Sequence, residues 1–343
     1  MRYVTFEVPS PVGPIERVGV LGASGSVIDI NLAARQYYAD RVGRRRGTAI
    51  ADALVPADLI ALLANLEVGQ DALHRVLDDL PIEVGRTDEQ GGTLVHALDS
   101  VRLLAPVPRP ASIRDCSAYE QHVAAASRGS VPKRWYDFPT YYKGNPFAVL
   151  GPDTVVPVPD DSEKCDYELE YAAVIGRSGR DLSPEQALDH IAGYLIFNDV
   201  SVRDVQFREM SVGLGPAKSK DFDGSNLFGP ALVTPDEWDP HVHHTMQAFV
   251  DDEEWSSGST TTIHFPVEEI VAHISQRETL RVGDIVGTGT VGGGCGLELG
   301  KYPLAARGSS CGSRGSAAWP TPGATPPGSG RRPSCGHAYD TYW

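Results

Sequence analysis

Two carboxylates stand at the start of an apolar run in the sequence CDYELEYAAV, which begins at Cys165. Alternate residues of a strand share one face, so Glu168 and Glu170 would point the same way. The segment AAVIG that follows is typical of a strand buried on both faces. Carboxylates that enter a core need a cation to neutralise them. The pattern therefore predicts a strand that carries a cation site into the core, although an isolated pair of this kind also fits a solvated sheet face.

Charge and composition limit the classes of partner. The chain has 343 residues, 41% of them hydrophobic, and a formal net charge of −15. Nucleic acids and anionic membranes are bound through clustered Lys and Arg, so neither is expected as a partner. No apolar run is long enough to span a bilayer, and the first residues lack the pattern of a secretory signal. Five scattered cysteines fit a reducing compartment, so we expect a cytoplasmic protein that acts on a small molecule.

Hydrophobic patterning divides the chain into parts. Residues 1–104 alternate strand-like runs with two helical stretches, which predicts a small N-terminal α+β domain. Three prolines within residues 103–112 indicate an extended linker. Strand patterns dominate residues 105–300 and the helices there are short. We therefore expect a mostly β fold of the α+β class.

Residues 301–343 differ abruptly from the rest of the chain. They contain five Lys and Arg and one Asp, so their net charge is +4, while residues 1–300 carry −19. Leu304 is their single branched aliphatic residue, so this segment cannot form a core. We predict a low-complexity tail, and a frameshifted gene is our hypothesis for it. Core strands would then lose partners, and a frame-restored chain would be more stable.

Two further carboxylates are placed to complete the cation site. Asp199 ends the apolar pattern YLIFND, and Asp115 follows the linker. Alone, either aspartate is typical of a turn or a helix cap. Together with Glu168 and Glu170 they offer oxygen ligands only, which favours a hard ion such as Mg²⁺, Mn²⁺ or Ca²⁺.

The order and spacing of these residues resemble a known family. The matching segments are Asp115 with His122 seven residues later, Glu168 and Glu170, NDVSVRDVQ from Asn198, GPAKSKDFDGSNLFGP with Lys220, and LRVGDIVGTGTVGG. As an ordered set, they resemble the fumarylacetoacetate hydrolase superfamily over residues 105–300. The resemblance implies a mixed β-roll or barrel for that part of the chain and a homodimer.

The resemblance also implies roles for the matching residues. The four carboxylates would bind a divalent ion, commonly Mg²⁺, and the ion would chelate a 2-oxo acid or a 1,3-diketo acid. His122 would activate water as a general base, and Lys220 would neutralise negative charge that develops on oxygen. Lys218 would be a surface charge. The matching substrate-binding positions are Tyr142, Arg128, Gln206 and Thr290, and Arg203 would organise the acidic residues.

One position departs from the family pattern. Relatives pair the histidine with a glutamate soon after the glycine-rich strand. The aligned residue here is Cys295, and Glu298 follows three residues later. A thiol cannot orient an imidazolium as a carboxylate does, so we expect the hydrolytic dyad to be impaired.

The function expected from these residues is a metal-dependent hydrolase. It would cleave a carbon–carbon bond in a small acidic 2-oxo or 1,3-dioxo compound, such as an acylpyruvate or a relative of fumarylacetoacetate. Two alternatives stay open at this stage. One is a decarboxylase, isomerase or dehydratase that uses the same site, and the other is an inactive metal-binding product of a gene damaged at its 3′ end.

Overall fold

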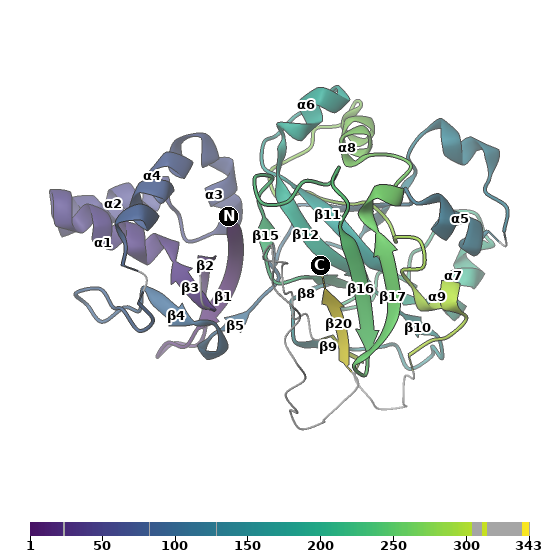
Figure 1. Cartoon of the computed structure of the whole chain (residues 1–343), viewed down its shortest axis with the longest axis horizontal. Helices are drawn as coiled ribbons and strands as arrows, with labels where there is room; N and C mark the ends of the chain where they lie inside the picture. The colour runs from purple at the N-terminus through teal and green to yellow at the C-terminus, as the bar shows by residue number, and fades with distance from the viewer. Residues whose placement is uncertain (23–24, 82, 128, 304–310, 314–337, 343) are drawn as a thin grey trace.

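One large mixed sheet of 13 strands runs through the molecule, as a computed structural model of residues 1–22, 25–81, 83–127, 129–303, 311–313 and 338–342 shows (Figure 1). Its main path has two open ends, so within the described residues it does not close into a barrel. The predicted α+β class with a mixed sheet is confirmed. In spatial order, the strands of the main path are β4 (Val95–Ala97), β3 (Ser26–Asp29), β2 (Ile15–Gly22), β1 (Arg2–Val8), β15 (Leu232–Val233), β12 (Ile191–Asp199), β11 (Leu169–Ile175), β18 (Ile285–Gly287), β6 (Ile113–Cys116) and β7 (Tyr141–Gly144).

The N-terminal strands carry four helices and continue the sheet of the larger body. β1 pairs with β15, and β15 pairs with β12, so the sheet crosses from the N-terminal part into the rest of the chain (Figure 1). Asp29 caps the first helix, because its side chain accepts the N–H of Leu32. The helices are α1 (Ile30–Val42), α2 (Arg44–Leu54), α3 (Leu59–Ala64) and α4 (Leu66–Asp79), and β5 (Arg102–Leu103) pairs with β1.

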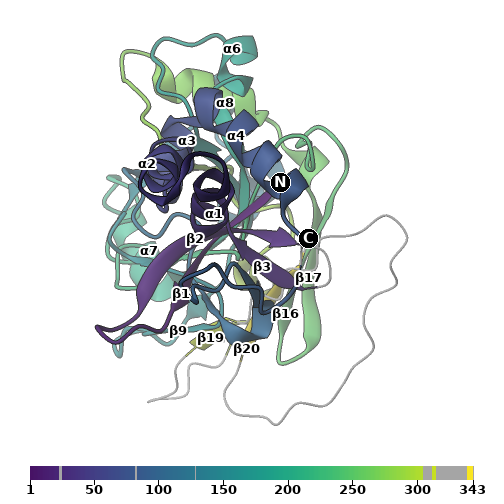
Figure 2. The same cartoon turned by 90° about the vertical axis from the view of Figure 1, so that its left-hand side faces the viewer.

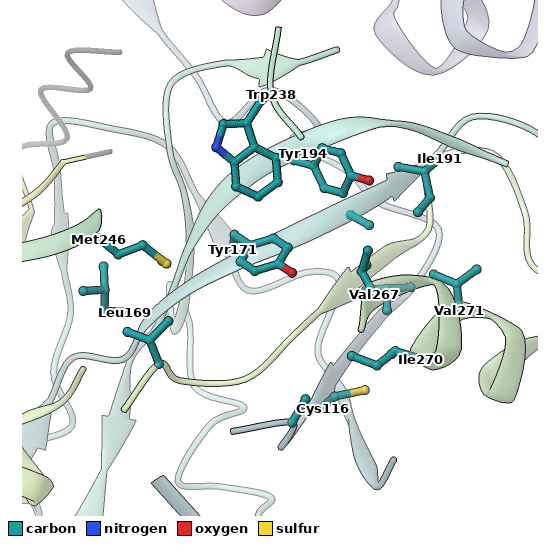
Figure 3. Packing of buried hydrophobic residues seen from close by; sticks show 14 of the residues in the cluster. Cys116, Leu169, Tyr171, Ile191, Tyr194, Trp238, Met246, Val267, Ile270 and Val271 are labelled. Carbon is teal, nitrogen blue, oxygen red and sulfur yellow. The ribbon is translucent and has the colours of Figure 1, made fainter. Parts of the chain in front are cut away.

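The central strands β11 and β12 are buried along their whole length. On one face, the rings of Tyr171 and Tyr194 lie 5.0 Å and 4.7 Å from that of Trp238, and Val267 of α8 (Val267–Ser275) belongs to the same cluster (Figure 3). On the other face, Val174 packs in a cluster with residues of α3 and α4. Cover on both faces explains the continuous apolar run of these strands.

The remaining elements are short helices and strands. Of the residues predicted to bind substrate, Gln206 lies on one of them, whereas Tyr142 lies on β7 and Thr290 follows β18. These short elements are α5 (Glu120–Ala126), β8 (Val149–Leu150), β9 (Thr154–Val156), β10 (Cys165–Asp166), α6 (Pro184–Leu188), β13 (Ser201–Val202), α7 (Arg203–Met210), β14 (Asn226–Phe228), β16 (Thr245–Val250), β17 (Glu253–Ser259) and α9 (Gly296–Leu299), with 3₁₀ turns at Leu98–Ser100, Lys133–Asp137 and Thr260–Thr262.

The C-terminal segment contributes two strands to a second sheet. Its order is β17-β16-β20-β19-β9, in which β19 (Cys311–Ser313) and β20 (Ala338–Tyr342) come from the segment predicted as a tail (Figure 2). β20 pairs with β16 and β19 pairs with β9. The expectation that this segment leaves strand edges unpaired is therefore wrong for β9 and β16. The frameshift hypothesis stays a prediction, because most of residues 301–343 lies outside the described residues.

Candidate active site

Four buried carboxylates meet where the central strands end. Asp115 lies on β6, Glu170 on β11 and Asp199 at the last position of β12, while Glu168 precedes β11 by one residue. No side chain of this set is more than 4% exposed, and one oxygen of each lies within 4.8 Å of the others. β11 lies between β12 and β18, and β18 pairs with β6, so neighbouring strands bring the carboxylates together. We call this set the carboxylate cluster.

Two buried cations touch one side of the carboxylate cluster. The Nζ of Lys220 donates to Glu168 and Asp199. The Nη2 of Arg203 lies 2.7 Å from Oε1 of Glu168, and its Nε donates to Oδ2 of Asp166 at 2.7 Å. Lys220 and Arg203 are 5% and 1% exposed, so both charges act in a medium that screens them weakly.

Among the described residues, no cation pairs with the other side of the cluster. Neither Asp115 nor Glu170 forms an ion pair with a described residue. Burial raises the pKa of both well above the usual range, and the charge of Asp199 adds to the effect on Asp115. Burial opposes ionisation of Glu168 as well, but Lys220, Arg203 and His122 outweigh it and lower the pKa of Glu168.

The donor set fits a hard divalent ion. Within the described part of the chain, Oδ1 of Asp115 and Oδ1 of Asp199 are buried and accept no hydrogen bond. Leaving such oxygens without a partner costs free energy that a bound cation would recover. All the ligand atoms are carboxylate oxygens, which suit Mg²⁺, Mn²⁺ or Ca²⁺ better than Zn²⁺.

The glycine-rich segment that begins at the end of β18 packs against the carboxylate cluster and donates hydrogen bonds to it. A Cβ on Gly287 would overlap Oδ1 of Asp115. Gly289 adopts a φ of 89° and donates its N–H to Oε2 of Glu170 at 3.2 Å, and Oγ1 of Thr290 donates to Oε1 of the same carboxylate at 3.1 Å. The glycines thus let backbone approach the carboxylates closely, and Thr290 lies beside the carboxylate cluster.

His122 connects the carboxylate cluster to a fifth carboxylate. It lies on α5 with Nε2 3.7 Å from Oε1 of Glu168, while Nδ1 lies 2.9 Å from Oε1 of Glu298. The other oxygen of Glu298 accepts the N–H of Gly293 at 2.7 Å. Cys295 is also near, with Sγ 3.8 Å from Nδ1.

The histidine therefore has a carboxylate partner, contrary to the impaired dyad expected from sequence. Cys295 occupies the position before α9, and Glu298 lies three residues further, within the first turn of that helix. One helical turn brings residues three apart to the same side, so Glu298 reaches the imidazole that sequence alignment assigned to Cys295. Burial raises the pKa of the Cys295 thiol, which donates to Glu298 at 3.6 Å.

The predicted substrate-binding residues divide into three groups. Tyr142 is at the cluster, because its hydroxyl donates to Oδ2 of Asp199 at 2.8 Å. Gln206 is linked to the cluster through Arg203: its side chain accepts from Nη1 of Arg203 at 2.9 Å, and Arg203 contacts Glu168. Arg128 lies outside the described residues. Lys218 is exposed, in contrast to the buried Lys220, as expected of a surface charge.

Two carboxylates with structural roles were not predicted from the sequence. Asp166 accepts the N–H groups of Gly296 and Leu297 at 2.7 and 3.0 Å, so it holds the start of α9 beside Arg203. Glu209, on α7, accepts the N–H groups of three consecutive residues before Lys220, namely Ala217, Lys218 and Ser219 at 2.9, 2.6 and 3.2 Å. Acceptance of several backbone N–H groups leaves no sequence pattern that would identify either residue.

Comparisons with known proteins identify the family that this chain resembles. The family model described as fumarylacetoacetate (FAA) hydrolase C-terminal matches residues 111–325. An oxaloacetate tautomerase of Bacillus subtilis is 31% identical over 61% of this chain and 68% of its own length. The mitochondrial oxaloacetate tautomerase of Homo sapiens is 30% identical over 84% of this chain and 81% of its own.

A solved structure extends the likeness to the fold. The fumarylacetoacetate hydrolase of Exiguobacterium antarcticum has a TM-score of 0.62 at 26% identity, over 89% of this chain and 91% of that one. Among the helices that the structure describes, none has the length and apolar character needed to cross a membrane. The family match and the tautomerase relatives together show that the chain belongs to the fumarylacetoacetate hydrolase family.

Proposed function

We propose that this protein is a divalent-metal-dependent enzyme that moves a proton on a small acidic 2-oxo acid and so interconverts its keto and enol forms. The observation that carries the proposal is the carboxylate cluster with His122 beside it, because oxygen ligands for a cation then lie as close as 3.7 Å to a histidine nitrogen that can accept a proton. Two relatives at 30 and 31% identity are oxaloacetate tautomerases, which favours a dicarboxylic 2-oxo acid as substrate.

The ion would be held by Asp115, Glu168, Glu170 and Asp199. Mg²⁺, Mn²⁺ or Ca²⁺ bound there would supply a Lewis acid for the oxygens of a chelating 2-oxo acid. The carboxylates would in turn hold the ion at the end of strands that are buried along their length, which limits its movement.

His122 would take the proton from the carbon next to the carbonyl and return it in the reverse direction. Its Nε2 faces the cluster, and Glu298 on Nδ1 fixes the orientation of the ring and stabilises the imidazolium that forms. Lys220 would neutralise charge on the carbonyl oxygen, since its ammonium is already held among the carboxylates. Tyr142, Gln206 and Thr290 would position the substrate.

Hydrolysis of a carbon–carbon bond is the second candidate. It is favoured by the His122 and Glu298 pair, since a histidine backed by a carboxylate can also activate water. In that reaction, the oxygen of water enters a carboxylate product and the released carbon takes the proton.

One assay distinguishes the candidates. The chain with Mg²⁺ is given the enol form of oxaloacetate, and loss of enol absorbance is followed in ultraviolet light; acylpyruvates are then offered in ¹⁸O-labelled water. Faster decay of the enol with no label in any carboxylate product supports the tautomerase. Label in a carboxylate supports the hydrolase, and calorimetric binding of oxalate without turnover of either substrate supports an inactive protein. A cytoplasmic location and a homodimer stay predictions.

A further inference from the structure

A second group of ligand atoms lies on the far side of His122 from the carboxylate cluster. Nδ1 of His122, Sγ of Cys295 and Oε1 of Glu298 converge there, with separations of 2.9 Å between nitrogen and oxygen, 3.8 Å between nitrogen and sulfur, and 3.6 Å between sulfur and oxygen. We call these residues the thiol triad. Its mixed nitrogen, sulfur and oxygen donors differ from the oxygen-only donors of the cluster.

The spacing of the triad suits one tetrahedral ion. Zinc bonds of about 2.0–2.1 Å to nitrogen, 2.3 Å to sulfur and 2.0–2.2 Å to oxygen place tetrahedral ligands roughly 3.3 to 3.6 Å apart. The three observed separations depart from these values by at most about 0.5 Å, so small side-chain movements would bring all three atoms into coordination. A water molecule would supply the fourth ligand.

The charges and the donor types point to a thiophilic ion. A thiolate and a carboxylate together cancel the two charges of the ion, and the imidazole binds as a neutral ligand. Sulfur and imidazole donors favour Zn²⁺ or Cd²⁺ over Mg²⁺, which prefers oxygen. On binding, the Cys295 thiol releases its proton to solvent, and the proton that His122 carries on Nδ1 toward Glu298 is lost from that nitrogen and replaced by one on Nε2.

We infer that His122, Cys295 and Glu298 form an inhibitory site for Zn²⁺ and similar thiophilic divalent ions, separate from the carboxylate cluster. Inhibition follows from the tautomer of the histidine. A neutral imidazole that coordinates through Nδ1 carries its proton on Nε2, and that nitrogen then cannot accept a proton from substrate. Binding of the ion does not depend on the proposed function; its inhibitory effect rests on it.

The binding test uses Cd²⁺ as the probe. The full chain is titrated with Cd²⁺ in excess Mg²⁺, and the ultraviolet absorption of the cadmium–thiolate bond is recorded for the wild type, for C295A and for the control C165A. Cys165 is buried as Cys295 is, but lies on β10 and not among the residues of the triad. We expect C295A to lose this absorption and to bind Cd²⁺ at least about 10- to 100-fold more weakly, while C165A resembles the wild type.

Each outcome decides a separate point. Equal absorption in C295A and the wild type, or no cadmium–thiolate signal at all in the folded wild type, overturns the site. E298Q is a second variant, whose side chain has nearly the same volume as the native one. If C295A fails to fold, weaker Cd²⁺ binding by E298Q supports the triad. Inhibition of turnover by Zn²⁺ should weaken by a similar factor in C295A. If the chain proves to have no turnover, the proposed function fails while the absorption still decides whether the ion binds.

Discussion

The two faces of His122 are built on different kinds of structure. On the Nε2 face, three of the four carboxylates of the cluster lie on β6, β11 and β12, where pairing with neighbouring strands fixes their positions. On the Nδ1 face, Glu298 and Cys295 come from a helix of four residues and the position before it. The ion site therefore depends on strands of the core, while the orientation of the base depends on the short helix α9.

The largest effect should come from the face built on strands. Replacing Glu170 with Gln keeps the side-chain volume but removes one of four charges, so Mg²⁺ affinity measured by calorimetry should fall by more than about 100-fold. Turnover should be lost with it. The same variant should melt in EDTA at the wild-type temperature or above it, because Glu170 is buried without a positive partner among the described residues.

The control is E269Q, which changes an exposed glutamate in the first turn of α8. It should leave both Mg²⁺ affinity and melting temperature as in the wild type. Wild-type Mg²⁺ affinity in E170Q would show that the carboxylate cluster is not the ion site.

Replacing His122 with Asn should separate the two faces. A general base contributes about 10²- to 10⁴-fold to rate, so kcat should fall within that range. Mg²⁺ affinity should stay unchanged, because His122 approaches the cluster only at 3.7 Å from Glu168. Loss of both Mg²⁺ affinity and activity in this variant would mean that the histidine supports the ion site and does not act as the base alone.

Replacing Glu298 with Gln tests the short-helix face alone. Loss of the carboxylate behind the imidazole should lower kcat by about 10- to 100-fold, with KM and Mg²⁺ affinity little changed. E120Q is the matched control, since Glu120 lies on the same helix as His122 but accepts from Tyr136. A larger loss in C295A than in E298Q would restore the thiol as the partner of the histidine.

The strand-borne face could be predicted from sequence, for a physical reason. Strand periodicity is two, so Glu168 and Glu170 in one apolar run predict a shared face without knowledge of the fold. Asp199 directly ends another apolar run. The order of strands in the sheet could not be predicted, because pairing between β6 and β18 joins segments about 170 residues apart.

The short-helix face could not be predicted in the same way. Alignment places Cys295 opposite the histidine, and only the four-residue helix α9 moves Glu298 into reach. Asp166 and Glu209 are recognised by the backbone N–H groups they accept, and those depend on the path of two loops. The pairing of β20 with β16 is a further case, since the composition of the tail predicted no strand at all.

The smallest effect should come from Glu209, which joins α7 to the segment before Lys220. Replacing it with Gln removes the charge from three backbone hydrogen bonds on a partly exposed side chain, so the free energy of unfolding should fall by about 1 kcal/mol and kcat by a few-fold. Burial opposes ionisation of Glu209, but these N–H groups outweigh it and lower its pKa in the folded chain.

The sign of its pH dependence follows from that shift. A carboxyl whose folded pKa lies below its unfolded value of about 4.3 stabilises the fold above that pH, and the contribution disappears as pH falls through the folded pKa. The stability difference between the wild type and E209Q, from urea unfolding at several pH values, should therefore be constant near neutral pH and vanish in acid. A difference that persists in acid would mean that Glu209 acts through its shape and not its charge, and α7 would then hold the segment before Lys220 by packing.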